Sequence, residues 1–328
     1  MRALELIEPG RMRLFDMPEP GAPGEGECLV EVLRTGICGT DLHAYRGRQP
    51  FFTYPRILGH ELAVRILASG RGVKDLEEGD RCTVEPFLNC GECAACRRNK
   101  TNCCERLRTY GVHIDGGMRE RFLYPARKLH RSAVLSPEQL ATVEPLCIGS
   151  HAFHRAQVRG GDSVVVIGSG PIGLAVAEAA RAAGVEPWMV EVSPARARFA
   201  RERLNLLVLT EIAGDLPQVI FDCTGNQNSM MSCFERLSHG GTIVFVGIHN
   251  GDLSFSNPNF HAREVTLLSS RNATAEDFQR VMRLLESGRV DVEAWWGKPV
   301  AAAEVPEAFP GWLDPEAGVI KPLIDWNL

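Results

Sequence analysis

Four cysteines in one short polar segment constrain this chain more than any other feature. Cys90, Cys93, Cys96 and Cys104 have the spacing C-x2-C-x2-C-x7-C. A loop with this spacing can surround a tetrahedral ion, and four thiolates leave no coordination position open, which is typical of structural zinc. The segment CGECAACRRNKTNCCE has almost no apolar side chains. Because zinc binding by such segments is worth about 10–16 kcal/mol, we expect the metal to order a lobe over about residues 88–106.

Alternatives to this structural zinc site follow from the same cysteines. An iron–sulfur cluster uses a similar cysteine spacing, and Cys103, beside Cys104, is a second candidate for the fourth thiolate. A zinc ribbon that binds nucleic acid is disfavoured, because the basic residues Arg97, Arg98 and Lys100 belong to a chain with a net charge of −5.

Composition limits the class of protein. The 328 residues are 45% hydrophobic and 23% charged, which is typical of a globular chain with two domains. The negative net charge disfavours nucleic acid and anionic membranes as partners, so we expect a small-molecule partner. The start MRALELIEPG lacks the pattern of a secretory signal, and the eleven cysteines are an odd number. We therefore expect a cytoplasmic protein whose clustered thiols bind metal.

A second set of metal-binding residue types is spread over three segments. Cys38 lies in GICGTDLHAY, His60 and Glu61 lie in ILGHE, and Glu144 lies in TVEPLCIG. A thiolate, an imidazole and a carboxylate suit zinc with one open position, where the ion acts as a Lewis acid. Glu61 is either a ligand or a neighbour of the ion. Cys147 competes with Glu144, since zinc accepts a soft thiolate readily.

The residues around Cys38 indicate how a proton would leave this site. Thr40 can hydrogen-bond to the oxygen of a bound substrate, and His43 is the nearest group that can pass a proton to solvent near neutral pH. Asp41 is the candidate partner that orients the ring of His60.

A glycine pattern follows a buried apolar run and opens a helix. Gly168, Gly170 and Gly173 follow SVVVI, and Pro171 and Ile172 lie between the last two glycines. In a dinucleotide-binding turn the first glycine turns the chain, the second admits the pyrophosphate, and the third lets the helix approach the strand. The pattern therefore predicts a nucleotide site at this turn.

The next strand ends predict the rest of the nucleotide site. Glu191 ends the second strand, where a carboxylate binds both ribose hydroxyls and repels a 2′-phosphate, so we expect NAD over NADP. Arg196 and Arg198 keep NADP as an alternative cofactor. DCTGN and VGI end later strands where the nicotinamide is expected to lie, and they contribute Thr224, Val246 and Gly247.

The order of apolar runs predicts two domains in an α/β chain. Residues 1–146 read as short strands and turns, whereas 147–271 alternate between strands and helices, as in a doubly wound parallel sheet. Residues 272–328, with a helix over about 275–286, are expected to complete the first domain. Between LLVL and QVIFDC the chain is too short for an ordinary crossover, so we expect that helix to be absent.

These motifs closely resemble the zinc-containing medium-chain alcohol dehydrogenase family over essentially the whole chain. The resemblance implies a GroES-like catalytic domain, 1–146 with 272–328, and a Rossmann NAD-binding domain, 147–271. It implies two zinc ions per chain, one catalytic and one structural. The implied residues are Cys38, His60 and Glu144 with Glu61 beside them, Cys90, Cys93, Cys96 and Cys104, and Thr40 and His43 for the proton relay.

Finer resemblances narrow the activity. Glu144 in EPL is similar to the sorbitol dehydrogenase branch, in which the carboxylate can reach zinc through water. The segments CGTDLHAYRGRQPFFTYPRILGHE, RTYGVHIDGG, DCTGNQ and SSRNATAEDF are similar to bacterial hexonate (L-galactonate-type) 5-dehydrogenases. By this resemblance Arg271 is a candidate for the substrate carboxylate or for a cofactor or backbone contact, and Lys321 is a candidate for the cofactor pyrophosphate.

We therefore expect an oxidoreductase that transfers hydride from a secondary alcohol of a polyol or sugar acid to NAD. A threonine or simple alcohol dehydrogenase is the alternative within the family, and a non-catalytic NAD-binding sensor is the alternative of another class. The resemblance also implies a homo-dimer or homo-tetramer formed through the edge strand of the nucleotide domain, near Gly241–Gly247.

Overall fold

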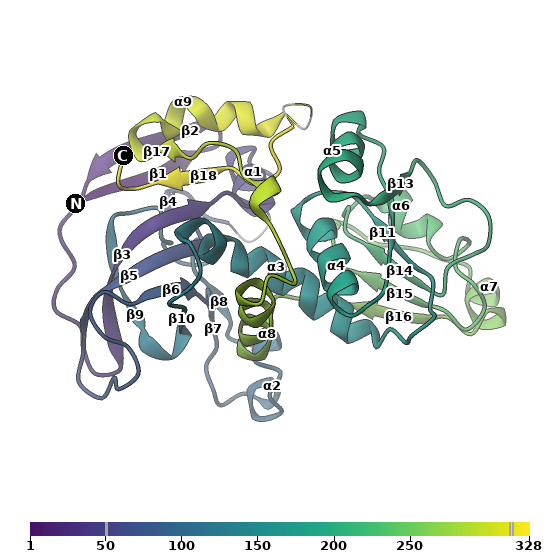
Figure 1. Cartoon of the computed structure of the whole chain (residues 1–328), viewed down its shortest axis with the longest axis horizontal. Helices are drawn as coiled ribbons and strands as arrows, with labels where there is room; N and C mark the ends of the chain where they lie inside the picture. Colours follow the sequence, from purple (N-terminus) through teal and green to yellow (C-terminus); the bar gives the residue numbers. More distant parts are fainter. Residues whose placement is uncertain (50–51, 315, 317) are drawn as a thin grey trace. The chain divides into compact units, whose positions relative to one another are not determined.

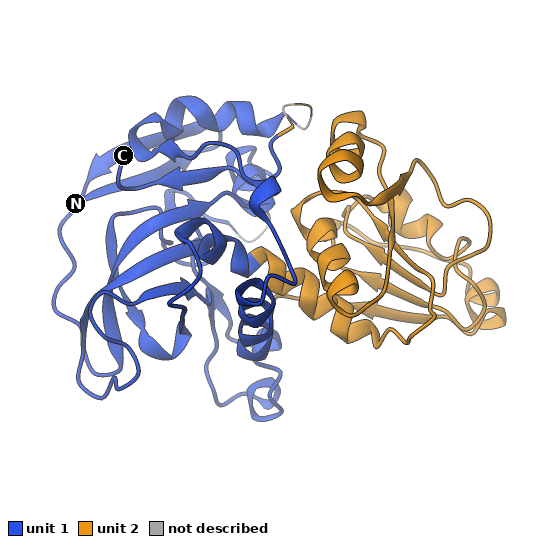
Figure 2. Ribbon diagram, viewed as in Figure 1, with its two compact units in different colours: residues 1–144, 273–314, 319–328 blue, residues 145–272, 315–318 orange. Residues whose placement is uncertain are grey.

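A computed structural model describes residues 1–49, 52–314, 316 and 318–328. The chain divides into two compact units, which Figure 2 colours separately. Unit 1 contains Met1–Glu144, Ala273–Asp314 and Val319–Leu328, and unit 2 contains Pro145–Asn272 and Pro315–Gly318. The units thus change after Glu144 and after Asn272, close to the domain limits expected from the sequence after residues 146 and 271. Pro50 and Phe51 of the hexonate-type segment lie outside the described residues.

Unit 1 is built mainly of antiparallel strands (Figure 1). Its sheets have the orders β2-β1-β4, β10-β6-β5-β3-β18-β17 with β9 beside β3, and β7-β8. The strands are β1 (Arg2–Glu8), β2 (Arg11–Asp16), β3 (Glu27–Gly36), β4 (Arg56–Ile57), β5 (Glu61–Ser69), β6 (Arg81–Val84), β7 (Phe87–Leu88), β8 (Arg108–Thr109), β9 (Arg121–Pro125), β10 (Leu129–Arg131), β17 (Val300–Ala301) and β18 (Leu323–Asp325); the helices are α1 (Gly39–Tyr45), α2 (Ala94–Arg97), α8 (Ala275–Glu286) and α9 (Val305–Ala308).

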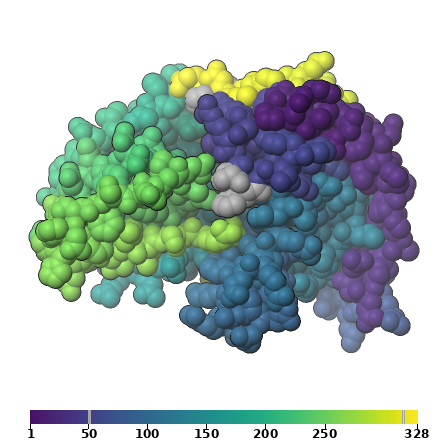
Figure 3. All heavy atoms as spheres, turned by 180° about the vertical axis from the view of Figure 1, so that it is seen from behind, coloured from purple at the N-terminus to yellow at the C-terminus, as the bar shows by residue number. Residues whose placement is uncertain are grey.

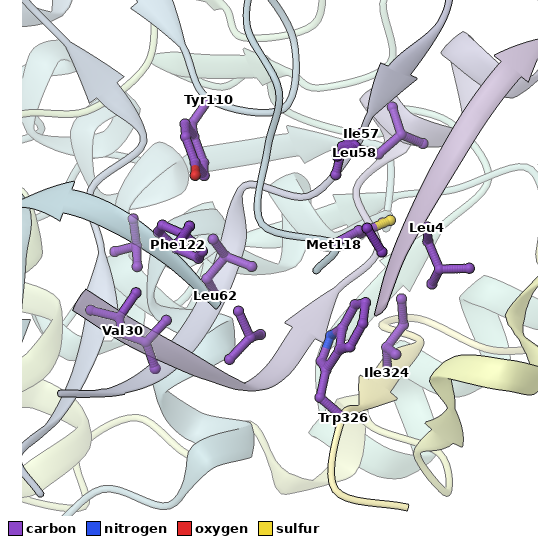
Figure 4. Packing of buried hydrophobic residues seen from close by; sticks show 14 of the residues in the cluster. Leu4, Val30, Ile57, Leu58, Leu62, Tyr110, Met118, Phe122, Ile324 and Trp326 are labelled. Carbon is purple, nitrogen blue, oxygen red and sulfur yellow. The ribbon is translucent and has the colours of Figure 1, made fainter. Parts of the chain in front are cut away.

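The core of unit 1 joins the two ends of the chain. Alternate residues of β3 face inward, and Val30 packs in one cluster with Leu62 and Phe122. Ile324 and Trp326, from the C-terminal segment, belong to the same cluster (Figure 4). Because burial of large apolar side chains is the main stabilising term, the C-terminal segment completes this unit, as the sequence predicts.

Unit 2 contains a six-stranded parallel sheet with the order β13-β12-β11-β14-β15-β16. The run VVVI of β11 is fully buried, which is typical of a central parallel strand. The strands are β11 (Val164–Ile167), β12 (Trp188–Val190), β13 (Leu207–Leu209), β14 (Val219–Asp222), β15 (Thr242–Phe245) and β16 (Thr266–Ser269); the helices are α4 (Pro171–Ala182), α5 (Pro194–Leu204), α6 (Gln227–Ser232) and α7 (Asn257–Ala262).

The crossover between β13 and β14 departs from the strand–helix alternation. β13 pairs in parallel with β12 at one edge of the sheet, and the described chain between β13 and β14 forms only bends and loop. The predicted absence of this helix is confirmed, and LLVL is nevertheless a strand of the sheet. None of the helices in the described residues is long and apolar enough to cross a membrane.

Two sequence-based expectations about elements are wrong. The first half of the long helix α3 (Pro137–Ala156) lies where strands and turns were expected, up to residue 146, and it contains both Glu144 and Pro145. Its start is capped reciprocally, because the Gln139 N–H donates to the Ser136 hydroxyl and the Ser136 N–H donates to the Gln139 amide oxygen.

The strand near Gly241–Gly247 is not at the edge of the sheet, which is the second wrong expectation. This strand is β15, and it pairs with β14 on one side and with β16 on the other. The run EVTLLSS that follows it forms β16, so β16 is the edge strand.

Candidate functional site

The first predicted metal cluster begins at the N-terminus of α1. Cys38 is the N-cap residue of this helix, and its backbone N–H donates to Asp41 Oδ2 at 2.9 Å. Asp41 is only 1% exposed. This cap fixes the backbone of Cys38 at the point where its thiol meets the other predicted ligands.

The remaining members of the cluster lie at the start of β5. Ligand atoms of Cys38, His60 and Glu61 all lie within 4.8 Å of one another. The chain can turn into His60 because Gly59 has a φ of +94°, a conformation that favours glycine. The sequence prediction that Cys38 and His60 meet is therefore matched by their positions in the structure, and Glu61 joins them.

Glu144 and Asp41 take different positions around this group. Glu144 is buried near enough to affect the titration of His60, but it is not one of the three residues whose ligand atoms meet. Asp41 Oδ1 lies 3.8 Å from His60 Nδ1, beyond hydrogen-bond distance. Cys147 is buried on α3 and is not part of the group.

Burial and charge act in opposite directions on the pKa values of these groups. Burial lowers the pKa of His60, but the opposing effect of Cys38, Asp41 and Glu144 is larger, so the pKa of His60 stands well above its usual value. Burial raises the pKa of Glu144 to about 7, against the opposing effect of His60. The acidic groups around the imidazole therefore favour positive charge at this place.

The donor set fits a zinc ion. A thiolate, an imidazole and carboxylates are the ligand types of catalytic zinc sites with an open position. Two polar atoms here, Asp41 Oδ1 and His60 Nδ1, are buried and have no hydrogen-bond partner among the described residues. Because buried polar atoms are nearly always paired, these two indicate that the site is completed by a bound group.

The predicted proton relay lies on α1. Thr40 is half-buried two residues after Cys38, and His43 is exposed one turn further along the helix. Burial of part of the ring lowers the pKa of His43, and the cationic Arg46 and Arg48 lower it further. The imidazole is therefore neutral, and able to accept a proton, over a wider pH range than usual.

The four cysteines of the lobe lie together around α2, with all four sulfurs within 4.8 Å of one another. Sγ–Sγ distances are 3.5 Å from Cys104 to Cys90, 3.9 Å from Cys93 to Cys104 and 4.0 Å from Cys90 to Cys96. Zinc–sulfur bonds of about 2.3 Å place tetrahedral sulfurs about 3.8 Å apart. The spacing fits one zinc ion, and the lobe can be followed in blue at the lower edge of Figure 3.

Hydrogen bonds lower the pKa values of Cys90 and Cys93, whereas burial raises the pKa of Cys104 to about 11. Backbone N–H groups of Cys90, Cys93 and Cys96 donate to neighbouring sulfurs at 3.3–3.5 Å. The N–H groups of Glu92 and Cys93 lower the pKa of Cys90 to about 6. Cys103 is exposed and outside the cluster, so the structure places Cys104 as the fourth sulfur.

The glycine pattern in unit 2 forms a tight turn between β11 and α4. Gly168 has a φ of +96°, and Gly170 is the N-cap of α4 with Pro171 as the first helical residue. A Cβ on Gly173 would lie 1.8 Å from the carbonyl oxygen of Gly168. Only glycine fits at that position, as expected for the residue that lets a helix approach its strand. Ile172 is partly buried within the first turn.

The other predicted nucleotide-site residues lie at the carboxyl ends of neighbouring parallel strands. Glu191 follows β12, and its carboxylate accepts hydrogen bonds from the N–H groups of Ser169 and Ser193 at 2.7 and 2.8 Å. This edge of an open parallel sheet is where ligands bind. The same edge carries Thr224 after β14 and Val246 and Gly247 after β15.

Two predicted residues lie elsewhere in the local structure. Arg271 is exposed, just after β16 in unit 2. Lys321 is buried in unit 1, where its ammonium group contacts both carboxylate oxygens of Glu61 at 2.6 and 2.7 Å. The contact of Lys321 with a cofactor pyrophosphate stays a prediction. Its pairing with Glu61, a residue 260 positions away, is not predicted by the sequence.

Comparison with known proteins decides the family. Residues 24–134 match the family model of the alcohol dehydrogenase GroES-like domain, and residues 171–287 match that of zinc-binding dehydrogenases. The L-galactonate-5-dehydrogenase of Escherichia coli (strain K12) is 41% identical over 283 residues, which are 83% of each chain. This chain belongs to the zinc-containing medium-chain alcohol dehydrogenase family.

Other members agree with this assignment. The 2-dehydro-3-deoxy-L-galactonate 5-dehydrogenase of Pseudoalteromonas atlantica is 30% identical over 320 residues, 93% of each chain. A short chain alcohol dehydrogenase (rspB) from E. coli CFT073, solved with NADH, has a TM-score of 0.91 at 26% identity over 99% of both chains. The predicted fold class, a GroES-like domain with a parallel-sheet nucleotide domain, is confirmed, as is the prediction of a dehydrogenase.

Proposed function

We propose that the chain oxidises a secondary hydroxyl of a sugar acid of the hexonate type, with NAD as hydride acceptor and zinc as the catalytic metal. The observation that carries this proposal is the buried group of Cys38, His60 and Glu61, in a chain 41% identical to an L-galactonate-5-dehydrogenase. Zinc, when bound there, supplies Lewis-acid polarisation of the substrate hydroxyl. Cys38, His60 and Glu144 are the proposed ligands.

The chain's own residues then account for movement of the proton. In our proposal the Thr40 hydroxyl accepts a hydrogen bond from the substrate hydroxyl and passes its proton towards His43. His43 is exposed and its lowered pKa keeps the imidazole neutral, so it can take up the proton and release it to solvent. Arg271 is the proposed partner of the substrate carboxylate, with which a guanidinium can form two parallel hydrogen bonds.

NAD is proposed to bind along the carboxyl edge of the parallel sheet, in a domain comprising residues 147–271. The turn at Gly168 and the N-terminus of α4 would receive the pyrophosphate. Glu191 would bind the ribose hydroxyls, because two backbone N–H groups hold its carboxylate in place. The other residues proposed to line the cofactor are Gly170, Pro171, Ile172, Gly173, Thr224, Val246 and Gly247.

A substrate panel tests this function directly. Purified enzyme is assayed with NAD and with NADP against aldonates, uncharged polyols, L-threonine and simple secondary alcohols. The proposal expects the highest kcat/KM for an aldonate with NAD, and an Arg271→Gln variant should lose more activity on aldonates than on polyols. Highest activity on threonine or on a simple alcohol would refute the substrate class, and NAD binding without turnover of any of them would favour a sensor.

The family also suggests a subunit arrangement, and we propose a homo-dimer or homo-tetramer. Among the described residues β16 is an edge strand of the sheet, and Leu267 on it is 37% exposed. An exposed apolar edge strand favours pairing with a second copy. Light scattering should give at least twice the 36.1 kDa of one chain, and Leu267→Lys should shift the mass towards one chain.

A further inference from the structure

A cavity of about 1000 Å³ lies in unit 1, and none of the described residues that line it belongs to either metal group. Its walls are residues 25–27 at the start of β3, the loop 72–76 between β5 and β6, residues 125–127 and 129–131 around β10, and one face of α8. A cavity of this volume can hold a small organic molecule.

The walls formed by β10 and α8 are joined to each other. The His130 ring on β10 stacks on the Phe278 ring of α8, with centroids 5.0 Å apart and an angle of 16° between the planes. His130 Nε2 also lies 3.2 Å from one oxygen of the buried Glu85 carboxylate, and the Lys128 ammonium group donates to the other. Because these contacts already hold the walls in place, a ligand would not have to order them on binding.

Four cationic side chains line the cavity, and most of their donors are available. These side chains are Lys74, Arg127, Arg131 and Arg283. Arg127 and Arg131 each make one long contact of 3.4 Å, with an amide oxygen and with a carboxylate on other segments. In the part of the chain that the structure describes, no hydrogen bond or ion pair holds the side chains of Lys74 and Arg283. Since each guanidinium carries five N–H donors, the lining has many unused donors.

The lining carboxylates are mostly held by groups outside the cavity. Glu25 pairs with Arg71 at 2.5 Å, and Glu286 accepts a hydrogen bond from a serine hydroxyl at 2.6 Å. The Glu27 carboxylate accepts one from a backbone N–H at 3.1 Å, which leaves Asp75 without such a contact among the described residues. The free cationic donors therefore favour an anion, and the carboxylates keep lone pairs that can accept hydrogen bonds from hydroxyl groups.

We propose that this cavity is a second small-molecule site, which binds a hydroxylated organic anion of the size of a sugar acid or a sugar phosphate. Arg127 and Arg283, from two different walls, bind its anionic group through paired N–H donors. Glu27 and Asp75 accept hydrogen bonds from its hydroxyls. The side chain of Met282, 6% exposed, supplies an apolar contact for its carbon atoms. The site uses neither zinc nor NAD, so it does not depend on the proposed function.

Calorimetric titration of the NAD-loaded holoenzyme tests the site with D-glucose 6-phosphate, D-gluconate and inorganic phosphate. We expect one of the two hydroxylated anions to bind once per chain, and inorganic phosphate to bind at least about tenfold more weakly, because it lacks carbon-bound hydroxyls. Arg127→Gln/Arg283→Gln should weaken this binding by about a hundredfold, through loss of two charged hydrogen-bonding groups. Arg11→Gln/Arg13→Gln, on β2, makes the same change of net charge away from the cavity lining and should bind as the wild type does.

Hydrogen–deuterium exchange locates the bound anion and does not depend on any variant. Amides of residues 72–76 and of α8 should exchange more slowly when the anion is bound. Tighter binding of D-glucose 6-phosphate would assign the anionic group as a phosphate, and tighter binding of D-gluconate would assign it as a carboxylate.

Four results would overturn the inference. These are binding of neither hydroxylated anion, equal affinity in the wild type and in Arg127→Gln/Arg283→Gln, inorganic phosphate that binds as tightly as the hydroxylated anions, and protection confined to α1 and the start of β5. The last result would place the anion at the predicted catalytic metal group. Failure of the proposed function is a separate result, because it appears as absence of turnover while binding at the cavity persists.

Discussion

Gly170 and Gly173, the last two glycines of the nucleotide turn, are predicted to respond very differently to substitution by alanine. In Gly173→Ala the new Cβ would lie 1.8 Å from the carbonyl oxygen of Gly168, whereas ordinary contact begins at 3.4 Å. The difference, 3.4 − 1.8 = 1.6 Å, must come from movement of α4 away from β11. A gap of that size removes much of the dispersion energy of the buried face of the helix.

The expected magnitude follows from this displacement. Overpacking in a rigid core costs about 1–3 kcal/mol, and we place Gly173→Ala at about 3 kcal/mol because backbone, not a mobile side chain, opposes the methyl group. Gly170→Ala is the matched control. Its Cβ would have no neighbour closer than the Arg196 guanidinium at 4.0 Å, and its φ of −74° suits alanine, so we expect a cost below about 1 kcal/mol.

Hydrogen–deuterium exchange and NAD titration together separate the loss of local stability from the loss of NAD binding. Amides of α4 should exchange about a hundredfold faster in Gly173→Ala, which corresponds to about 3 kcal/mol, and little faster in Gly170→Ala. Gly170→Ala should instead weaken NAD binding by about tenfold or more, since the second glycine admits the pyrophosphate. Equal exchange rates in both variants, or NAD affinity that Gly170→Ala leaves intact, would refute the reasoning.

Three further predictions concern the relay, the ribose contact and the lobe. His43→Ala should lower kcat by about a hundredfold. In the wild type, activity should fall at acid pH because protonation of His43 abolishes its role as proton acceptor, and this acid limb should lie below the ordinary histidine pKa of about 6.5 because the pKa of His43 is lowered. The His43→Ala variant should lack this limb. A pH–rate series checks this, and an unchanged limb would exclude His43. Glu191→Ser should raise the KM for NAD by about tenfold to a hundredfold, the value of a charged hydrogen bond, with NADP affected less in parallel assays. Cys96→Ser should release the zinc of the lobe, measured by metal analysis, and make the exposed Arg97 a faster site of trypsin cleavage, because the segment loses its order. Retention of that zinc would argue against a four-thiolate site.

Local patterns explain why much of the molecule could be predicted. The glycine turn and the strand runs carry their signals within a few residues, and the cysteine spacing defines a closed loop. The helix α3 was missed because Pro145 lies inside it, and proline normally ends a helix. The signal that could have revealed its start is Ser136 followed three residues later by Gln139, with Pro137 as the first helical residue.

Other features depend on tertiary structure and leave no local trace. The pairing of Glu61 with Lys321 spans 260 positions, and a single buried lysine near a chain end gives no pattern to read. The order of parallel strands is likewise not encoded in their periodicity, so β15 was placed at the sheet edge in place of β16. The sequence could not decide whether Cys103 or Cys104 is the fourth thiolate, because adjacent residues differ only in the direction of their side chains.

Zinc content of the wild type and of His60→Ala tests the central claim most directly, because the two proposed metal groups share no residue. The account predicts two zinc ions per wild-type chain. It predicts one in His60→Ala, which should keep its cysteine-lobe zinc and its affinity for NAD but reduce no NAD with any aldonate. A His60→Ala protein that still holds two zinc ions, or that still turns over substrate, would contradict it.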